Sequence, residues 1–476
     1  MSEVKTLFKN VSWVTLSLIV ANICAFIWTI SIARYLGVND YGILSFAISF
    51  TVLLGMGTDI GMTTYSTREI SKDNSMTQKF VNNIIPFKIV LSVLLFIFTA
   101  IILKLLGYND LVIEVSLIMS IETIFICMLN FIVGVFQANE KQKTNAIVGM
   151  ITSFLLVLVT LIVIFLNLGI IFVAFAYAFA YLFNMVSMYI VLRRTFGVPK
   201  FEIDWDFWKK TAKKSIPFGL SIFFYTMYFS IDVVMIQFLV GDYPTGIYNS
   251  AYKIVSVFVA FYSIYQAVIF PLMSKLYSED TNLLKISFEQ SFKYSLLILL
   301  PLSIGVYLYS PYLINLIYSS EYALAAVPMQ ILIWTVVFMF INGVGTSLLN
   351  SIGKEISVTK SYVIAAVFNI ILNCILIPRY TYIGASISTV LSEILIMAIM
   401  LYYISKTEYM PNKISLLKTV IKLIVSGAIL FVVLDLLNLS LWLAIPVGLL
   451  VYIIALVVTK SIDDTDKYII KEILGK

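Results

Sequence analysis

Four carboxylates lie inside long apolar stretches of the sequence, where a charge is expensive: Asp59, Glu122, Asp232 and Glu393. An ionisable group at the centre of a membrane-spanning helix costs roughly 2.5–3.5 kcal/mol to insert, so it usually faces protein or water. Such a carboxylate is able to exchange a proton or to hold a sodium ion. The alternative is that it only forms hydrogen bonds between helices. The chain has 0 histidines, so coupling to protons would depend on carboxylates, and we rank Asp232 and Glu122 first.

Four cations in or beside the same stretches suit the recognition of phosphate, which attracts a cationic side chain. They are Lys88, Lys253, Lys293 and Arg34. Lys88 and Lys293 begin apolar stretches at matching places, so the alternative is that they snorkel to lipid headgroups. For Arg34 the alternative is an anchor at the membrane interface. Lys253 lies at the same predicted depth as Asp232 on the next helix, so we expect an ion pair, either purely structural or part of a cavity.

The sequence offers no motif for metal binding or nucleotide hydrolysis. Cys24, Cys127 and Cys374 stand alone in separate apolar stretches, far from the spacing of a metal or redox site. A Gly-x-x-x-x-Gly-Lys-Ser/Thr phosphate loop is missing from the sequence. The formal charge of +6 is dispersed, so no nucleic-acid partner is expected. We expect no cofactor other than a coupling proton or sodium ion.

The composition places the chain in a membrane. Of 476 residues, 61% are hydrophobic and 12% are charged, and the mean hydropathy is +0.99. Soluble domains are about 25% charged. Runs of apolar residues long enough to cross a bilayer predict an all-α integral membrane protein with about 14 transmembrane helices. The predicted spans are 11–34, 41–65, 83–106, 112–136, 144–168, 170–192, 215–240, 246–272, 288–311, 324–349, 358–378, 383–405, 415–437 and 440–460.

The distribution of basic residues predicts the orientation. Of the 32 Lys and Arg residues, only Arg34, Lys104 and Arg379 are assigned to the odd-numbered loops, and the first two lie at the ends of the spans beside them. Because cytoplasmic loops carry an excess of positive charge, we predict a multi-pass protein of the cell membrane with both termini cytoplasmic. The first span is expected to stay as a helix rather than act as a signal peptide. The outer loops are short, which argues against a membrane glycosyltransferase with an outer domain.

An internal repeat predicts the domain organisation. Gly42-Ile43 matches Gly246-Ile247, and Lys88 matches Lys293 at a nearly equal offset. Six spans per repeat imply a pseudo-two-fold axis along the membrane normal. We predict an N-terminal lobe at 1–192, a basic cytoplasmic linker at 193–214 that lies on the lipid surface, a C-terminal lobe at 215–405, and two further helices with a cytoplasmic tail at 406–476.

Three groups of residues occur together in an order found in a known family. They are Asp59-Ile60-Gly61-Met62 with Thr67-Arg68-Glu69-Ile70; Ile231-Asp232-Val233 with Gly246-Ile247-Tyr248 and Ala251-Tyr252-Lys253; and Ile377-Pro378-Arg379-Tyr380 with Ile383-Gly384-Ala385-Ser386-Ile387-Ser388-Thr389. The chain thereby resembles the polysaccharide transporter family, of the Wzx or O-antigen flippase type. That family belongs to the multidrug/oligosaccharidyl-lipid/polysaccharide flippase superfamily.

The resemblance implies a flippase rather than an enzyme. Its expected substrate is a polyprenyl-(pyro)phosphate-linked oligosaccharide, moved from the inner to the outer leaflet by alternating access. Membrane lipids are expected partners, and glycan polymerases or glycosyltransferases are further candidates. The alternatives are a MATE-type cation-coupled multidrug antiporter, which two extra C-terminal helices argue against, and a lipid II flippase. A purely structural scaffold is disfavoured by the charges inside the membrane.

Overall fold

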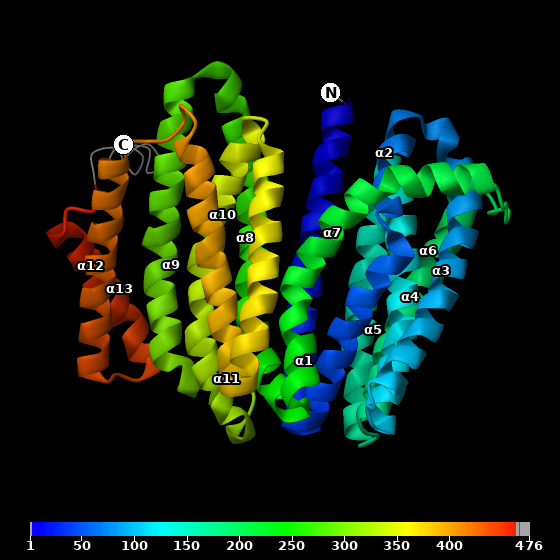
Figure 1. The fold of residues 1–476 in the computed structure, drawn as a ribbon, viewed down its shortest axis with the longest axis horizontal. Helices are drawn as coiled ribbons and strands as arrows, with labels where there is room; N and C mark the ends of the chain where they lie inside the picture. The colour runs from blue at the N-terminus through cyan, green and yellow to red at the C-terminus, as the bar shows by residue number, and fades with distance from the viewer. Residues whose placement is uncertain (1, 463–465, 467–476) are drawn as a thin grey trace. The chain divides into compact units, whose positions relative to one another are not determined.

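The computed structural model describes residues 2–462 and residue 466, and every regular element within them is a helix (Figure 1). The first seven α-helices are α1 (Ser2–Asp59), α2 (Met62–Lys72), α3 (Thr77–Leu105), α4 (Asp110–Ala138), α5 (Gln142–Phe165), α6 (Ile170–Phe196) and α7 (Trp205–Val240). The others are α8 (Asp242–Glu279), α9 (Thr281–Ile317), α10 (Ala326–Ser351), α11 (Glu355–Ser405), α12 (Lys413–Leu437) and α13 (Leu441–Val458). Two short 3₁₀ helices, Asn74–Met76 and Ser320–Ala325, precede α3 and α10. The predicted all-α membrane fold is confirmed.

Two of these helices are too long for a single crossing. The apolar part of α1 has 47 residues and α11 has 51, whereas about 20 residues cross a bilayer. Each helix is interrupted at one residue with non-helical backbone angles, Gly37 in α1 and Thr381 in α11. Within the described part of the chain, 11 helices are long and apolar enough to cross, or up to 12 with α7, which bends by 50° between Phe224 and Thr226. Counting α1 and α11 twice is compatible with the predicted fourteen spans.

The end of the second predicted span differs from the prediction. The span at 41–65 ends at Asp59, and a separate short helix, α2, begins at Met62. Between them, Ile60 has φ 45° and Gly61 has φ 78°. Gly61 occupies the left-handed region, which glycine adopts without a steric penalty and which stops an α-helix. The apolar pattern alone gave no sign of this break.

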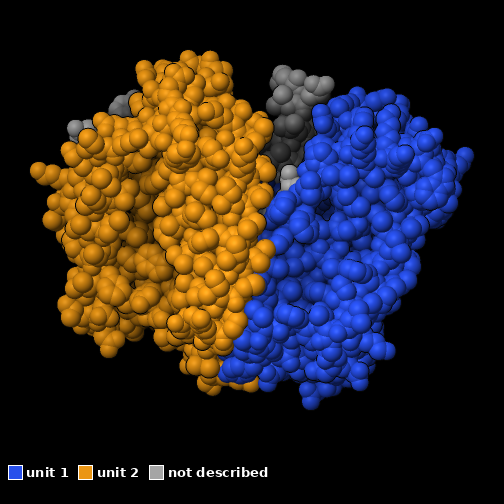
Figure 2. Space-filling view, viewed as in Figure 1, with its two compact units in different colours: residues 1–249 blue, residues 250–476 orange. Residues whose placement is uncertain are grey.

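The chain forms two compact units, Met1–Asn249 and Ser250–Lys476, shown in different colours in Figure 2. The first holds α1 to α7 and the start of α8. In the second, α10 packs against α9 and α11, and α12 and α13 pack together beside α9. The predicted division at 1–192, 193–214, 215–405 and 406–476 stays a prediction about the repeats. Residues 205–214 of its linker are helical and form the first turns of α7.

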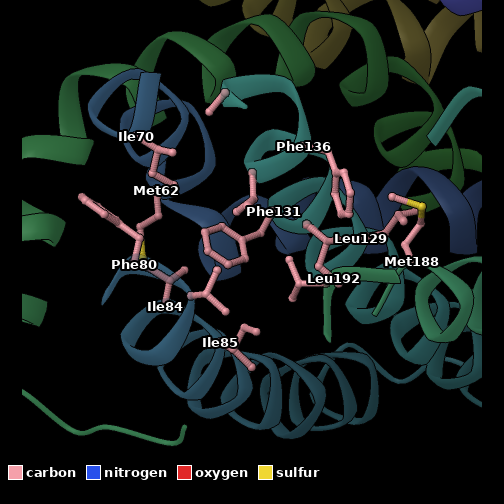
Figure 3. Packing of buried hydrophobic residues seen from close by; sticks show 14 of the residues in the cluster. Met62, Ile70, Phe80, Ile84, Ile85, Leu129, Phe131, Phe136, Met188 and Leu192 are labelled. Atoms are coloured by element: carbon pink, nitrogen blue, oxygen red, sulfur yellow. The ribbon is translucent and has the colours of Figure 1, made fainter. Parts of the chain in front are cut away.

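A buried apolar cluster in the first unit joins the short helix α2 to its neighbours (Figure 3). Met62 and Ile70 come from α2, Phe80 from α3, Phe131 from α4 and Leu192 from α6, and each is at most 3% exposed. Because lipid tails are as apolar as these side chains, close van der Waals packing rather than removal from water holds such helices together in a membrane. This packing fixes α2 against α3 and α4 and so fixes the residues at the break before it.

The repeated glycines meet each other in the first unit. A Cβ on Gly42 would lie 2.1 Å from the carbonyl oxygen of Asp242, and a Cβ on Gly246 would lie 2.0 Å from the carbonyl oxygen of Val38. These four positions correspond in pairs in the sequence repeat, so the contact is reciprocal. Only glycine allows the second half of α1 and the start of α8 to approach this closely.

Candidate functional site

The break between α1 and α2 is closed by α7, and two glycines make this possible. A Cβ on Gly61 would lie 2.3 Å from the backbone nitrogen of Gly219, and a Cβ on Gly219 would lie 2.6 Å from the carbonyl carbon of Ile60. Any larger residue at either place would push α7 away. The break is therefore a built feature of the fold, with Asp59 on one side of it and Thr63 on the other.

A buried ion pair lies directly at this break. Nζ of Lys88, on α3, donates to a carboxylate oxygen of Asp59, to the hydroxyl of Thr63 at 3.2 Å and to the carbonyl oxygen of Cys127 at 3.0 Å. The Lys88 side chain is 1% exposed and that of Asp59 is 20% exposed. Lys88 is thus paired inside the protein and does not snorkel to the membrane surface.

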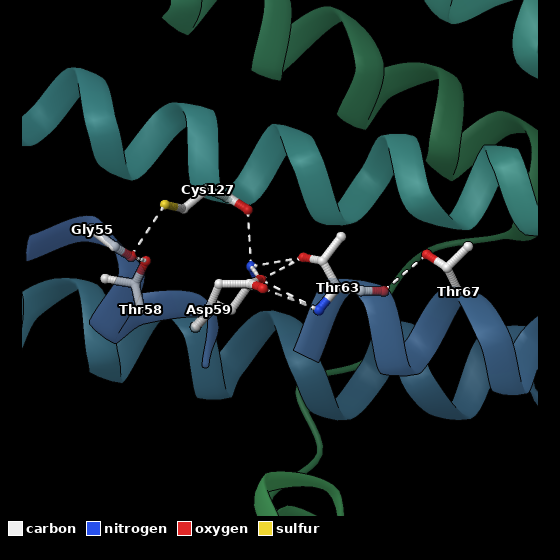
Figure 4. Close-up of polar contacts among 7 residues, drawn as sticks. Gly55, Thr58, Asp59, Thr63, Thr67 and Cys127 are labelled. Atoms are coloured by element: carbon white, nitrogen blue, oxygen red, sulfur yellow. Dashed lines mark hydrogen bonds and ion pairs between the residues drawn. The ribbon is translucent and has the colours of Figure 1, made fainter. Parts of the chain in front are cut away.

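Asp59 also organises the start of α2 (Figure 4). Its carboxylate accepts from the backbone N–H of Thr63 at 3.3 and 3.4 Å and from the Thr63 hydroxyl. The first N–H groups of a helix lack partners within the helix, and a negative charge beside them is favourable. Asp59 therefore joins three elements, because it ends α1, supports α2 and neutralises the lysine of α3.

A polar pocket of about 590 Å³ opens beside the pair, and Asp59 and Thr63 line it. Further out, its lining includes four exposed polar side chains: Thr64 and Arg68 from α2, and Asn130 and Gln137 from α4. Polar groups at membrane depth usually face water or protein rather than hydrocarbon. The first unit therefore contains a pocket whose lining includes an arginine and several neutral polar side chains.

The other predicted carboxylates lie outside this pocket. Glu122 of α4 is 2% exposed; its Oε2 is 3.4 Å from the hydroxyl of Thr123, and its Oε1 has no hydrogen-bond partner within the described part of the chain. Asp232 of α7 accepts from the hydroxyl of Tyr248 at 2.8 Å. In the second unit, Glu393 of α11 accepts from the side-chain amide of Asn342 at 2.7 Å.

The other three predicted cations, Lys293, Lys253 and Arg34, lie on three different helices. Lys293 of α9 is buried and donates to Asp466, which also accepts from the hydroxyl of Tyr294 at 2.8 Å. Like its repeat partner Lys88, it is neutralised by a carboxylate. Lys253 is half-buried on α8, and Arg34 is exposed on α1. The pair of Asp232 with Lys253 joins residues of different units and stays a prediction, as do the proposed roles of all eight residues.

Sequence reasoning missed several residues of the pocket. Asn130, Gly134 and Gln137 are spaced i, i+4, i+7, which puts two polar side chains and a glycine on one face of α4. That spacing was a usable signal. The sequence gave no signal for the carbonyl oxygen of Cys127, because every residue has a backbone carbonyl. Only the packing of the helices determines which carbonyl accepts from Lys88.

Comparison with known families accounts for this architecture. Residues 7–277, more than half of the chain, match the family described as "Polysaccharide biosynthesis protein". The chain belongs to this family. The match confirms the resemblance seen in the sequence, and it makes the protein a multi-pass membrane transporter of the flippase superfamily. Residues 217–375 also match the family described as "MatE".

Three relatives cover the chain to different extents. An uncharacterized membrane protein of Methanocaldococcus jannaschii is 26% identical over 85% of this chain and 85% of its own length. The capsular polysaccharide biosynthesis protein CapF of Staphylococcus aureus is 23% identical over 83% of this chain and 98% of its own. The probable low-salt glycan biosynthesis flippase Agl15 of Haloferax volcanii is 24% identical over 38% of each chain.

Two solved structures share the fold. The lipid II flippase MurJ, in an inward closed conformation, has a TM-score of 0.77 at 16% identity and covers 97% of this chain and 99% of its own. An inward-facing multidrug resistance MATE family transporter has a TM-score of 0.64 at 14% identity and covers 81% of this chain and 94% of its own. At these identities the likeness concerns the fold alone.

Proposed function

We propose that this protein flips polyprenyl-(pyro)phosphate-linked oligosaccharide from the inner to the outer leaflet for the assembly of a surface glycan. The observation that carries the proposal is the match of residues 7–277 to the polysaccharide biosynthesis protein family. The names of two relatives also refer to glycan biosynthesis: one is a capsular polysaccharide biosynthesis protein and the other a probable glycan biosynthesis flippase. The substrate would be an amphiphile whose sugar and phosphate need a wet path and whose isoprenoid tail stays in lipid.

The polar pocket of the first unit supports this assignment. Arg68, Asn130 and Gln137 supply a positive charge and amide donors beside apolar spans, and charge-assisted hydrogen bonds from arginine suit phosphate oxygens. In this proposal the protein lies in the cell membrane with both termini cytoplasmic, and it alternates access between the two sides. Glycosyltransferases and a glycan polymerase would make and consume its substrate.

A coupling cation is the second part of the proposal. We infer that Glu122 binds it, because Glu122 is buried near the middle of α4 and one carboxyl oxygen has no partner within the described residues. A bound proton or sodium ion would give that oxygen the partner it lacks among the described residues. Asp59, Asp232 and Glu393 rank lower, because none of their carboxyl oxygens is both buried and without a hydrogen-bond partner in the described part of the chain.

Reconstitution into liposomes tests the proposed transport. A polyprenyl-pyrophosphate oligosaccharide with a fluorescent sugar is placed in both leaflets, and a reductant that cannot cross the membrane quenches the outer pool. The protein should let the inner pool become accessible faster than in protein-free liposomes. Equal rates with and without correctly inserted protein would overturn the proposal.

A MATE-type antiporter is the second candidate, because residues 217–375 match the MatE family. That match is shorter than the one to the polysaccharide family and covers neither α12 nor α13. The typical multidrug member has twelve helices, so this terminal pair argues for a lipid-linked substrate. A lipid II flippase is the third candidate, and what favours it is likeness of fold over 97% of the chain.

A further inference from the structure

An apolar groove runs along the first unit between α1, α3 and α7. Its volume is about 850 Å³, within the range of roughly 300–1,000 Å³ usual for ligand sites. Leu94 and Phe98 of α3 and Leu220 of α7 line it and are 57%, 50% and 53% exposed. The groove is open, and no polar side chain lines it among the described residues. An apolar lining of this kind suits the hydrocarbon chain of a lipid.

The groove ends at the polar pocket. Met56 and Gly219 line both, and across the break Ile60 faces the groove while Asp59 and Gly61 face the pocket. The groove and the pocket therefore adjoin at the contact of Gly61 with Gly219, where the lining changes from apolar to polar. A ligand that fills both must be an amphiphile with its head at Arg68 and its chain along α3.

The charges of the pocket select an anionic head. Asp59 is neutralised by Lys88, and Glu69 is paired with Lys72 at 2.7 Å. Arg68 lies within electrostatic reach of Glu69 but forms no salt bridge in the part of the chain that the structure describes, and Glu69 is paired with Lys72, so the pocket keeps a net positive charge. The amides of Asn130 and Gln137 and the hydroxyl of Thr64 add neutral donors for phosphate oxygens.

We propose that this groove and pocket bind the lipid part of the transported substrate, with the isoprenoid chain in the groove and its phosphate against Arg68. This inference rests on the proposed function, and it names the site at which the substrate is held. Other apolar pockets fit less well. The pocket between α9, α12 and α13 has no charged lining residue among those described, and the one between α9, α10 and α12 has a lysine, Lys413, but no hydroxyl or amide side chain.

Gly57 offers a direct way to fill the groove. It lines the groove, and a Cβ built on it meets nothing within 4 Å, so Gly57→Leu adds bulk without a backbone clash. Gly305→Leu is the matched control, because Gly305 also lies within a helix, also meets nothing within 4 Å and lines the pocket of α9, α12 and α13. Arg68→Gln removes the charge and keeps most of the length.

The experiment measures binding of polyprenyl monophosphate, without sugar, to the purified full-length protein by native mass spectrometry. Gly57→Leu should weaken binding by about tenfold or more, whereas Gly305→Leu should leave it unchanged. Arg68→Gln should weaken binding of polyprenyl phosphate but not of uncharged polyprenol. A chain lacking the three native cysteines and carrying Gly57→Cys, blocked with a bulky thiol reagent after purification, repeats the test on protein that has already folded.

Three outcomes would overturn the inference. Binding that survives both ways of filling the groove excludes it as the tail site. Loss of binding in Gly305→Leu alone places the tail in the second unit. Equal binding of phosphatidylglycerol, weakened equally by Gly57→Leu, makes this a site for ordinary anionic lipid. If instead polyprenyl phosphate binds as expected but no oligosaccharide is flipped, the site stands and the proposed function fails.

Discussion

At the scale of single residues, the structure around the break in the first unit depends on a buried lysine that forms an ion pair with a carboxylate. Lys88 is buried and reaches Asp59, Thr63 and the Cys127 carbonyl from α3. Removing one partner of a buried pair leaves an uncompensated charge, which costs far more than the intact pair contributes. The pair should therefore matter most for the shape of the break and the pocket.

Stability measurements test this pair. Asp59→Asn leaves Lys88 charged and buried, so it should destabilise the protein by about 3–5 kcal/mol, while the double variant Asp59→Asn, Lys88→Met should recover most of the loss. Thermal unfolding in detergent reports the change. The control is Lys72→Met. Lys72 pairs with Glu69, and the Lys72 side chain is 55% exposed, so this substitution should lower the free energy of unfolding by less than about 1 kcal/mol. Equal losses in the control and in Asp59→Asn would contradict the account.

The coupling carboxylate makes a second prediction at this scale. In liposomes, an imposed proton or sodium gradient should accelerate flipping by the native protein. Glu122→Gln keeps the size of the side chain but removes the ionisable group, so it should abolish the acceleration and spare slow equilibration. Glu393→Gln, also buried but with its oxygen already bonded to Asn342, should keep the response. A gradient response that persists in Glu122→Gln would refute the assignment.

At the scale of elements, the sequence predicted the spans but not the break that positions the site. Long apolar runs have few alternatives to a membrane helix, and the predicted 144–168 corresponds to α5, Gln142–Phe165. The apolar pattern continues through Ile60 to Met62, so nothing in it marks the end of α1. The pairing of Lys88 was missed because a sequence gives the depth of a residue, not which neighbouring helix its side chain faces.

The close crossing of α1 and α8 gives a prediction about elements. Asn249 donates to the hydroxyl of Ser45 at 2.5 Å beside the two glycines, so cysteines at these two positions should cross-link in a chain without its native cysteines. Adding Gly42→Ala places a Cβ against the carbonyl of Asp242. Overpacking of this kind typically costs about 1–3 kcal/mol, so the cross-linking yield should fall several-fold.

Gly57→Ala is the matched control for this experiment, because its Cβ meets nothing within 4 Å. It should leave the yield unchanged. A yield that is insensitive to Gly42→Ala would show that the two helices do not need the glycine contact.

At the scale of the whole molecule, the account requires an even number of crossings with both termini inside. A cysteine at Tyr312, which is 45% exposed at the predicted outer end of α9, should react with an impermeant thiol reagent added outside. Lys471→Cys, which lies outside the described residues, should react only after the membrane is opened. Outer labelling at position 471 would reverse the predicted topology.

The central claim is the class of substrate, and one comparison tests it most directly. The same purified protein is reconstituted with a fluorescent polyprenyl-pyrophosphate oligosaccharide, with fluorescent lipid II or with a cationic dye, and the three transport rates are measured under identical gradients. The account predicts that the oligosaccharide lipid is moved well above the protein-free rate and faster than the other two. Extrusion of the dye, or flipping of lipid II, without movement of the oligosaccharide lipid would contradict it.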